Sequence, residues 1–166
     1  MTNELKALLI KFWGYDTFRP KQKEIITAII QQKDTLALLP TGGGKSICYQ
    51  LPAIALDGVC IVISPLIALM QNQVDGLKKR NIKSSFINSS MSKREIDITL
   101  DNCIYGNTKL LYISPERLKT EIFIERFKKM KVSFIAVDEA HCISQWGYDF
   151  RPSYLNIAIL KEYNPN

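Results

Sequence analysis

The residues best suited to chemistry lie in a glycine-rich stretch. It reads Thr41-Gly42-Gly43-Gly44-Lys45-Ser46. Glycine adopts backbone angles that other residues avoid, so successive N–H groups can point inward around an anionic phosphate. Lys45 can then reach the β- and γ-phosphates of a nucleotide, and the Ser46 hydroxyl is placed to ligate Mg²⁺. The stretch therefore predicts a phosphate-binding loop.

The match to the general pattern G-x-x-x-x-G-K-[ST] is incomplete, because Leu39 stands where the first glycine should fall. Gly-Lys-Ser alone fits a flexible turn before a helix equally well. The apolar run before the loop, the helical pattern after it and a second motif favour the phosphate loop.

That second motif is an acidic pair, Asp138-Glu139, which directly follows the apolar run 132–137. In a parallel sheet the pair lies at the carboxyl edge, where α/β proteins bind ligands. Asp138 would hold Mg²⁺ through its water shell alongside Ser46, and Glu139 would position and deprotonate the attacking water. The alternative is a solvated acidic pair that caps the next helix.

The elements that must position these motifs alternate between strand and helix. Strands are expected at about 35–39, 59–63, 85–87, 110–113 and 132–137, with helical spacing or helix-start signals between them. Two further helices precede the first strand, and the helix after the loop should bend or end near Pro52. We predict an α/β fold, a parallel sheet with helices on both faces, forming a single domain over 1–166.

Composition sets broader limits. The 166 residues are 46% apolar and 23% charged, ordinary values for a globular protein, and the formal charge of +6 is compatible with phosphate-rich partners. No apolar run reaches the length of a membrane span and the N-terminus lacks a signal-peptide pattern, so we expect an intracellular protein, in the cytoplasm or nucleoid of a bacterium or the nucleus of a eukaryote. The four cysteines are widely separated, which favours reduced, packed thiols over a zinc site or disulfides.

The two motifs and their flanks, residues 39–50 and 137–152, resemble the RecQ family of superfamily 2 DNA helicases. That family uses ATP to unwind DNA in the 3′ to 5′ direction, acts in DNA repair and recombination, and tolerates the missing first glycine. The resemblance covers nearly the whole chain and implies the first RecA-like lobe of such a helicase, with ATP and Mg²⁺ as ligands.

The same resemblance assigns further nucleotide-binding residues. Phe18-Arg19-Pro20-x-Gln22 is similar to the family's adenine-reading motif. It implies that Gln22 hydrogen-bonds the adenine edge, Tyr15 stacks on the ring and Arg19 supports the site. From the residues alone, Tyr15 would be a core aromatic and Gln22 a surface amide. His141 would link the nucleotide to DNA-sensing elements, although a lone histidine is more often packed in a core.

DNA contacts are implied at three places. Two segments between a strand and a helix look like the family's motifs that grip the DNA backbone, and 146–151 resembles its aromatic-rich loop. Such contacts would be salt-sensitive and independent of sequence. The family usually has histidine where this chain has Tyr148, and two of the rings could equally pack into a core. The residues implied are Ser64, Pro65, Leu66, Ser114, Arg117, Trp146, Tyr148, Phe150 and Arg151.

RecQ helicases also need a second RecA-like lobe, whose arginines complete the ATP site, and this chain stops at Asn166 before that lobe would begin. We therefore expect the chain alone not to unwind DNA. Two alternatives stay open. One is a nucleotide- or DNA-binding module without catalysis; the other is a lobe of a DEAD-box RNA helicase, which the aromatic loop disfavours.

Overall fold

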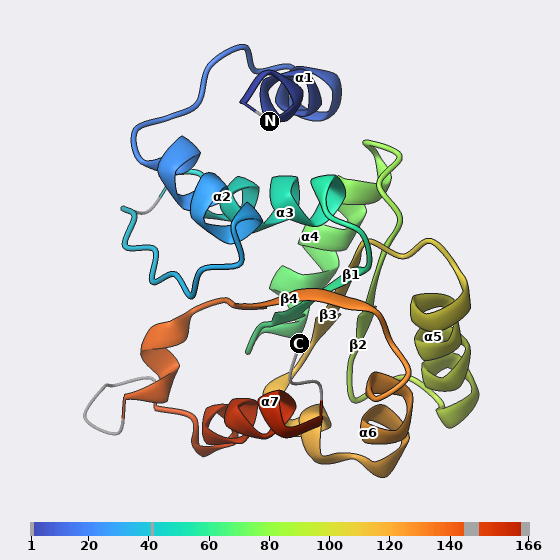
Figure 1. Ribbon diagram of the computed structural model, residues 1–166. Helices are drawn as coiled ribbons and strands as arrows, with labels where there is room; N and C mark the ends of the chain where they lie inside the picture. Colours follow the sequence, from blue (N-terminus) through green and yellow to red (C-terminus); the bar gives the residue numbers. More distant parts are fainter. Residues whose placement is uncertain (1, 41, 145–149, 164–166) are drawn as a thin grey trace. The chain divides into compact units, whose positions relative to one another are not determined.

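The computed structural model describes residues 2–40, 42–144 and 150–163. The chain divides into two compact units, Met1–Asp57 and Gly58–Asn166, and each is described by itself (Figure 1). The prediction of a single domain stays a prediction.

The described residues of unit 1 form the helices α1 (Thr2–Trp13), α2 (Gln22–Ile30) and α3 (Lys45–Ala55). Their apolar positions recur at helical spacing and give the unit a small core. Helix α1 is followed by Gly14, whose φ of 73° and whose hydrogen bond to the Ile10 carbonyl (2.9 Å) end the helix. Pro52 lies inside α3, which ends at Ala55. The buried core residues are Leu5, Leu9, Ile26 and Leu51.

The predicted strand at residues 35–39 is wrong for this structure. These residues form an irregular segment in which the Leu36 and Leu38 side chains are 78% and 84% exposed. A strand exists only when its backbone pairs with another strand. Among the described residues of unit 1 there are helices but no other strand, so this apolar sequence has no partner within its unit.

Unit 2 is built on a four-stranded parallel sheet. Its strands are β1 (Val59–Ile63), β2 (Ser84–Ile87), β3 (Leu110–Ile113) and β4 (Val132–Val137), in the order β2-β3-β1-β4. Three of the four match the predicted bounds, and β2 begins one residue earlier than expected. Continuous apolar runs such as β1, which is buried along its whole length, are typical of parallel strands covered on both faces. The predicted α/β fold is confirmed.

Helices cover both faces of this sheet. Ile61 and Ile63 lie in a cluster with Phe123, Phe127 and Leu160. These partners belong to α6 (Glu121–Phe127) and α7 (Ile159–Tyr163), and residues of α5 (Lys93–Tyr105) complete the cluster. Alternate strand residues face the other way, and α4 (Ile67–Lys78) packs beside β2 and β3. Short 3-10 helices lie between these elements, namely η1 (Pro115–Lys119), η2 (Ala140–Ile143) and η3 (Pro152–Ala158).

Polar contacts fix the ends and flanks of these helices. Helix α5 begins with a capping box, in which the Ser92 hydroxyl accepts from the Glu95 N–H (3.3 Å) and Glu95 accepts from the Ser92 N–H (2.8 Å). The hydrogen bonds from Ser92 hold the pKa of Glu95 below its usual range. Arg126 of α6 pairs with Asp97 (2.5 Å) and Asp101 (3.0 Å) of α5, which ties the two helices together.

Candidate active site

The phosphate loop of unit 1 has a conformation that suits glycine. Gly42 and Gly44 have φ angles of 77° and 79°, in the left-handed region that other residues rarely adopt. A Cβ on Gly43 would lie 2.8 Å from the Pro40 carbonyl, and one on Gly44 would collide with the Gln22 amide. The Gly43 N–H donates to the Pro40 carbonyl at 2.9 Å and closes the turn. Thr41 lies outside the described residues.

Two side chains, one just before α2 and one at its first residue, hold this loop. The Arg19 guanidinium donates to the Gly42 carbonyl, and the Gln22 amide nitrogen donates to the Gly44 carbonyl at 3.1 Å. The Gln22 amide oxygen accepts from the Arg19 N–H at 2.9 Å. Residues that the resemblance assigned to nucleotide binding are therefore brought to the phosphate loop by contacts within the protein.

Gln22 is 2% exposed, and both ends of its amide already have a protein partner. An amide has two N–H donors and two acceptor lone pairs, so adenine would have to use the remaining ones or replace these contacts. Adenine recognition by Gln22 stays a prediction. Tyr15, predicted to stack on the ring, is 49% exposed.

The loop leads directly into α3, which begins at Lys45. The first N–H groups of a helix have no partner within it and carry the positive end of its dipole, so they attract anions. The Lys45 side chain is exposed and Ser46 is half-buried. Unit 1 thus presents a cation, a hydroxyl and a helix start together.

The acidic pair lies where predicted, at the carboxyl edge of the sheet in unit 2. The Asp138 N–H donates to the Ile63 carbonyl at 2.9 Å, which extends the pairing of β4 with β1. The Asp138 carboxylate accepts from the Glu139 N–H at 3.1 Å. Glu139 has a φ of 52°, which is uncommon for a residue with a side chain.

Glu139 and His141 face each other after this turn. A carboxylate oxygen of Glu139 lies 3.3 Å from Nδ1 of His141, and the side chains are 35% and 59% exposed. Glu139 is the N-cap residue of η2, yet its side chain makes no capping hydrogen bond. Helix capping therefore does not account for the acidic pair, and His141 is not a packed core residue.

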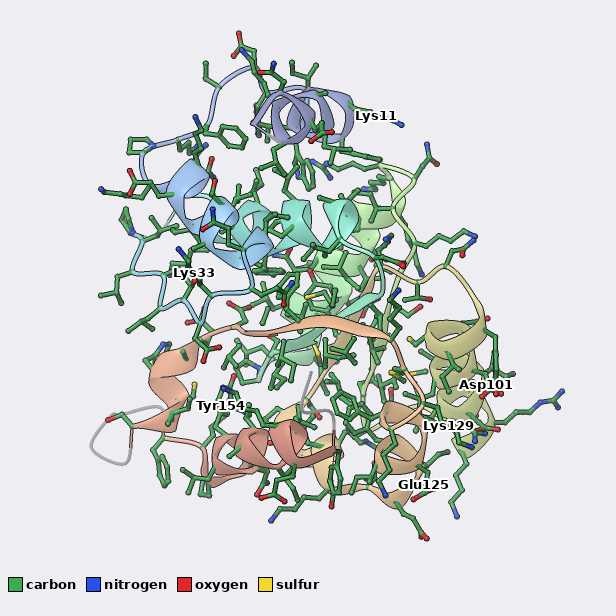
Figure 2. The ribbon with its side chains drawn as sticks, viewed as in Figure 1. Lys11, Lys33, Asp101, Glu125, Lys129 and Tyr154 are labelled. Carbon is green, nitrogen blue, oxygen red and sulfur yellow. The ribbon has the colours of Figure 1, made fainter. Side chains whose placement is uncertain are left out.

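Tyr154, which follows the aromatic-rich segment, supports this edge. The Tyr154 hydroxyl donates to the Asp138 carbonyl at 2.9 Å, and its side chain is 1% exposed; Figure 2 labels this residue. Burial is the main cause of a pKa for Tyr154 well above its usual range. Sequence reasoning missed Tyr154, because an aromatic residue in an apolar stretch indicates only a core position.

Arg151 joins segments that are far apart in the sequence. Its N–H donates to the Cys142 carbonyl at 2.9 Å, and its guanidinium donates to the Pro65 carbonyl at 3.2 Å. Arg151 therefore connects η2, directly after the acidic pair, with the segment after β1 that was predicted to contact DNA.

The other residues that were predicted to contact DNA differ in how exposed their side chains are. Ser64 is completely buried, its N–H donates to the Ile113 carbonyl (3.1 Å), and its hydroxyl has no hydrogen-bond partner among the described residues. It therefore presents no polar group to DNA in this structure. Leu66 is 49% exposed, and Arg117 is partly buried with its guanidinium donating to the Asn88 carbonyl at 3.1 Å.

Pro65 and Ser114 are partly exposed at the same sheet edge, and Phe150 is half-buried. Trp146 and Tyr148 lie outside the described residues. The two halves of the predicted ATP site thus belong to different units, the phosphate loop to unit 1 and the acidic pair to unit 2.

Comparisons with known proteins agree with the motifs. The chain is 49% identical over 161 residues to the ATP-dependent DNA helicase RecQ of Bacillus subtilis, covering 96% of this chain and 27% of that protein. It is 46% identical to the ATP-dependent DNA helicase RecQ of Haemophilus influenzae, covering 96% of this chain and 26% of that protein. The predicted resemblance to RecQ helicases is confirmed, and the chain spans about a quarter of the length of these relatives.

A solved structure shares the fold at low sequence identity. The crystal structure of a hypothetical ATP-dependent RNA helicase from Sulfolobus tokodaii has a TM-score of 0.71 and 19% identity, covering 100% of this chain and 48% of that one. No helix among the described residues has both the length and the apolar character needed to cross a membrane. Residues 19–165 match the DEAD/DEAH box helicase family, and the chain belongs to that family.

Proposed function

We propose that this chain is the ATP-binding lobe of a RecQ-like DNA helicase, which couples ATP hydrolysis to unwinding in the 3′ to 5′ direction. The observation that carries the proposal is the loop at 42–46, whose backbone suits glycine and which opens a helix with Lys45 and Ser46. High identity to proteins named as RecQ helicases, over 96% of the chain, supports the choice within the family. A second lobe with the arginines that complete the site is part of the proposal.

The residues present fit a nucleotide with Mg²⁺. The loop's backbone requires glycine, because a Cβ at Gly43 would collide with the Pro40 carbonyl and one at Gly44 with the Gln22 amide. Hydroxyl and carboxylate oxygens such as those of Ser46 and Asp138 are ligands that Mg²⁺ prefers. When bound, Mg²⁺ neutralises charge on the phosphate oxygens. Lys45 would pair with the same phosphates, and the N–H groups at the start of α3 would donate to them.

Glu139 is the proposed general base. Its carboxylate would accept a proton from the water that attacks the γ-phosphate. His141, 3.3 Å from that carboxylate, would orient it and report its state to the residues that follow. Buried Tyr154 would hold the backbone of Asp138 in place through its hydrogen bond.

DNA binding is proposed at the segments after β1 and β3 and at the aromatic-rich loop. Leu66 is exposed for apolar contact, and Trp146 and Tyr148 would stack on bases without selecting a sequence. Arg117 would have to share its guanidinium between the Asn88 carbonyl and a phosphate. Arg151 is the proposed coupling residue, because it contacts both the Pro65 carbonyl and the segment after the acidic pair.

Steady-state ATPase assays of the whole protein test this proposal, with single-stranded DNA, single-stranded RNA or neither added. We expect stimulation by DNA and loss of turnover by several powers of ten in Lys45→Ala and Glu139→Gln. Lys33→Ala, which removes an exposed lysine shortly before the loop, is the matched control and should keep full activity. Unchanged turnover in Glu139→Gln would refute the mechanism.

The same assays separate the two alternatives. Stronger stimulation by RNA than by DNA would favour an RNA helicase lobe. Binding of a fluorescent ATP analogue without any turnover would favour a binding module. Unwinding of a duplex with a 3′ tail but not of one with a 5′ tail would establish the proposed direction.

A further inference from the structure

The loops that precede strands β2, β3 and β4 carry the positive charge of this chain. Residues 78–83, 106–109 and 128–131 hold eight of the 22 Lys and Arg side chains and include no Asp or Glu. The formal charge of the whole chain is +6, so without these loops it would be slightly acidic. Because the strands are parallel, all three loops lie at the edge where the strands begin, opposite the edge with Asp138.

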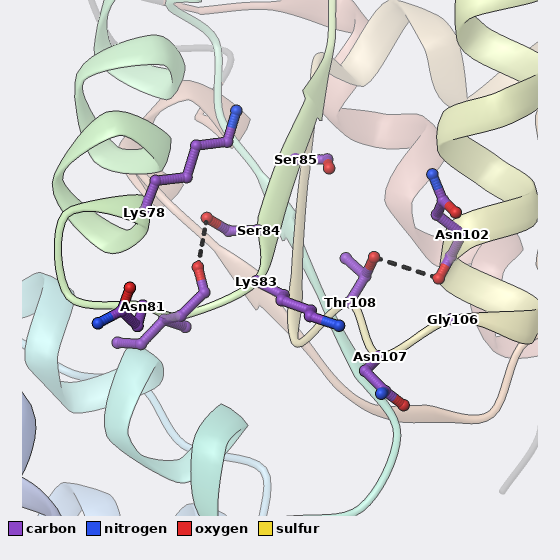
Figure 3. Close-up of a pocket in the computed structure, with 10 residues that line it drawn as sticks. Lys78, Asn81, Lys83, Ser84, Ser85, Asn102, Gly106, Asn107 and Thr108 are labelled. Atoms are coloured by element: carbon purple, nitrogen blue, oxygen red, sulfur yellow. Dashed lines mark hydrogen bonds between the residues drawn. The ribbon is translucent and has the colours of Figure 1, made fainter.

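A groove opens between two of these loops, and we call it the basic groove (Figure 3). Its volume is about 600 Å³, and it lies between the end of α4 with the start of β2 and the end of α5 with the residues before β3. The side chains around it are lysines, amides and hydroxyls, with Ile82 as the one apolar member. The residues used below are Lys78, Asn81, Lys83, Ser84, Asn107 and Thr108.

Internal hydrogen bonds fix the backbone of the basic groove. The Lys109 N–H donates to the Lys83 carbonyl at 2.8 Å and joins the two loops. Thr108 donates through its hydroxyl to the Asn102 carbonyl at 3.2 Å, and Ser84, 5% exposed, lies at the bottom with its hydroxyl 3.4 Å from the Ile82 carbonyl. With this scaffold in place, the exposed side chains at the rim can bind a ligand without remodelling the loops.

Those rim side chains are exposed and of one chemical kind. Lys78, Asn81, Lys83 and Asn107 are all exposed, and Figure 3 shows that they come from both walls. Ammonium, amide and hydroxyl groups are the side chains that contact the phosphate and sugar oxygens of nucleic acids. A lysine in the last turn of a helix also complements the helix dipole, which explains Lys78 but not the basic and amide residues that follow it.

We propose that the basic groove is a second nucleic-acid contact, which binds the sugar–phosphate backbone of DNA at the sheet edge opposite the acidic pair. Its binding is independent of base sequence, because the exposed lysine and amide side chains at its rim can contact the sugar–phosphate backbone without reading the bases. The site goes beyond the proposed function, since it adds a place to hold a further DNA segment at the sheet edge away from Asp138 and Glu139.

The salt dependence of DNA binding tests this site in the whole protein. Each phosphate contact contributes a slope of about 0.7 for single-stranded and about 0.9 for duplex DNA to log K against log salt. For the double variant Lys78→Gln with Lys83→Gln, fluorescence anisotropy with a labelled oligonucleotide should show a slope smaller by about 1.4 to 1.8 and an affinity about tenfold lower at low salt.

The matched control is Lys6→Gln with Lys11→Gln, two exposed lysines of α1, which changes the charge equally and should leave the slope unchanged. ATPase activity without DNA should be the same in both double variants. The experiment therefore distinguishes failure of the proposed DNA-binding groove from failure of the proposed ATPase function. Equal slopes in the two double variants, both folded by circular dichroism, would overturn the proposal.

A crosslinking experiment tests directly whether DNA binds at the basic groove. All four native cysteines are buried, and burial raises the pKa of Cys48 to about 11 and that of Cys103 to about 12. A thiol introduced by Asn107→Cys would therefore react with benzophenone maleimide at neutral pH faster than these four cysteines, and the whole protein without the substitution is the labelling control. We expect it to crosslink to single-stranded DNA on illumination, and unlabelled DNA to suppress the crosslink. Absence of a crosslink, or suppression by polyglutamate but not by DNA, would overturn the proposal, the latter in favour of an acidic protein partner.

Discussion

The two candidate half-sites are supported in different ways. In unit 1 the phosphate loop is held by side chains, since Arg19 and Gln22 bind the carbonyls of Gly42 and Gly44. In unit 2 the acidic pair is held mainly by backbone pairing, because the Asp138 N–H continues the hydrogen bonds between β4 and β1. Single substitutions beside the loop should therefore disturb its geometry, whereas the acidic pair should fail only when the sheet or its packing fails.

The largest expected effect tests that dependence on packing. Phe127→Ala removes a fully buried ring from the cluster under the sheet and should lower the free energy of unfolding by about 3–5 kcal/mol. Urea denaturation followed by circular dichroism measures it. Ile124→Ala on the same helix, at a position that is only half-buried, is the control and should cost clearly less. Equal losses would mean that the cluster does not carry the stability of unit 2.

The next effect tests the side-chain support of the loop. Gln22→Ala leaves the Arg19 N–H and the Gly44 carbonyl without their partner in a region where Gln22 is 2% exposed, which should cost about 1–3 kcal/mol. Nucleotide affinity, measured with a fluorescent ATP analogue, should fall together with stability. Gln31→Ala, at the exposed end of α2, should change neither. Weaker nucleotide binding with unaltered stability would instead favour a direct contact with the base.

A smaller effect is expected from the hydroxyl that supports the acidic pair. Tyr154→Phe keeps the buried ring but removes the hydrogen bond to the Asp138 carbonyl, and should cost about 0.5–1.5 kcal/mol of stability. Since the neighbouring backbone pairing stays, kcat should fall less than in Glu139→Gln while KM for ATP changes little. Loss of activity as complete as in Glu139→Gln would show that the sheet alone does not hold Asp138.

The smallest effect on stability is expected at the capping box that begins α5. Among the described residues, neither half-site contains such a box. The hydrogen bonds from Ser92 lower the pKa of Glu95 in the folded protein. The contact therefore contributes its full stabilisation at pH values above the pKa that Glu95 has in the unfolded chain. This stabilisation disappears as the pH falls through the lower pKa of the folded protein. Ser92→Ala should therefore reduce the melting temperature slightly at neutral pH and by less in acid. Thermal melts at pH 7 and pH 3 measure the difference. A larger drop in melting temperature for Ser92→Ala at pH 3 than at pH 7 would contradict the proposed link to the pKa of Glu95.

Much of unit 2 could be predicted from sequence, because its signals are local. The continuous apolar runs of β1, β3 and β4 and the capping box at Ser92 need only neighbouring residues to be recognised. The segment 35–39 has an equally apolar sequence but no strand, since pairing depends on a partner that may lie far away in the chain. The local sequence pattern thus sets the tendency of a segment to form a strand. Whether a strand forms depends on a second strand that pairs with it in the folded protein.

The candidate sites divide in the same way. The phosphate loop and the acidic pair were found because their residue types and spacing are tied to chemistry. The side chains that hold these two motifs were not found from the sequence. Gln22 contacts the Gly44 carbonyl, and Tyr154 the Asp138 carbonyl, only because the folded chain brings these residues together. Burial of Ser64 could not be predicted either, because serine before proline is an ordinary helix start and carries no sign of depth.

The end strand of the sheet has a consequence for the folding chain. β4 has the sequence Val-Ser-Phe-Ile-Ala-Val, is uncharged, and lies last in the strand order, so no strand among the described residues pairs with its outer edge. Such edges template aggregation, and charged gatekeeper residues on either side oppose it. β4 is flanked by Lys131 and by Asp138 and Glu139. We therefore expect the carboxylates proposed for ATP hydrolysis also to oppose self-association of the nascent protein.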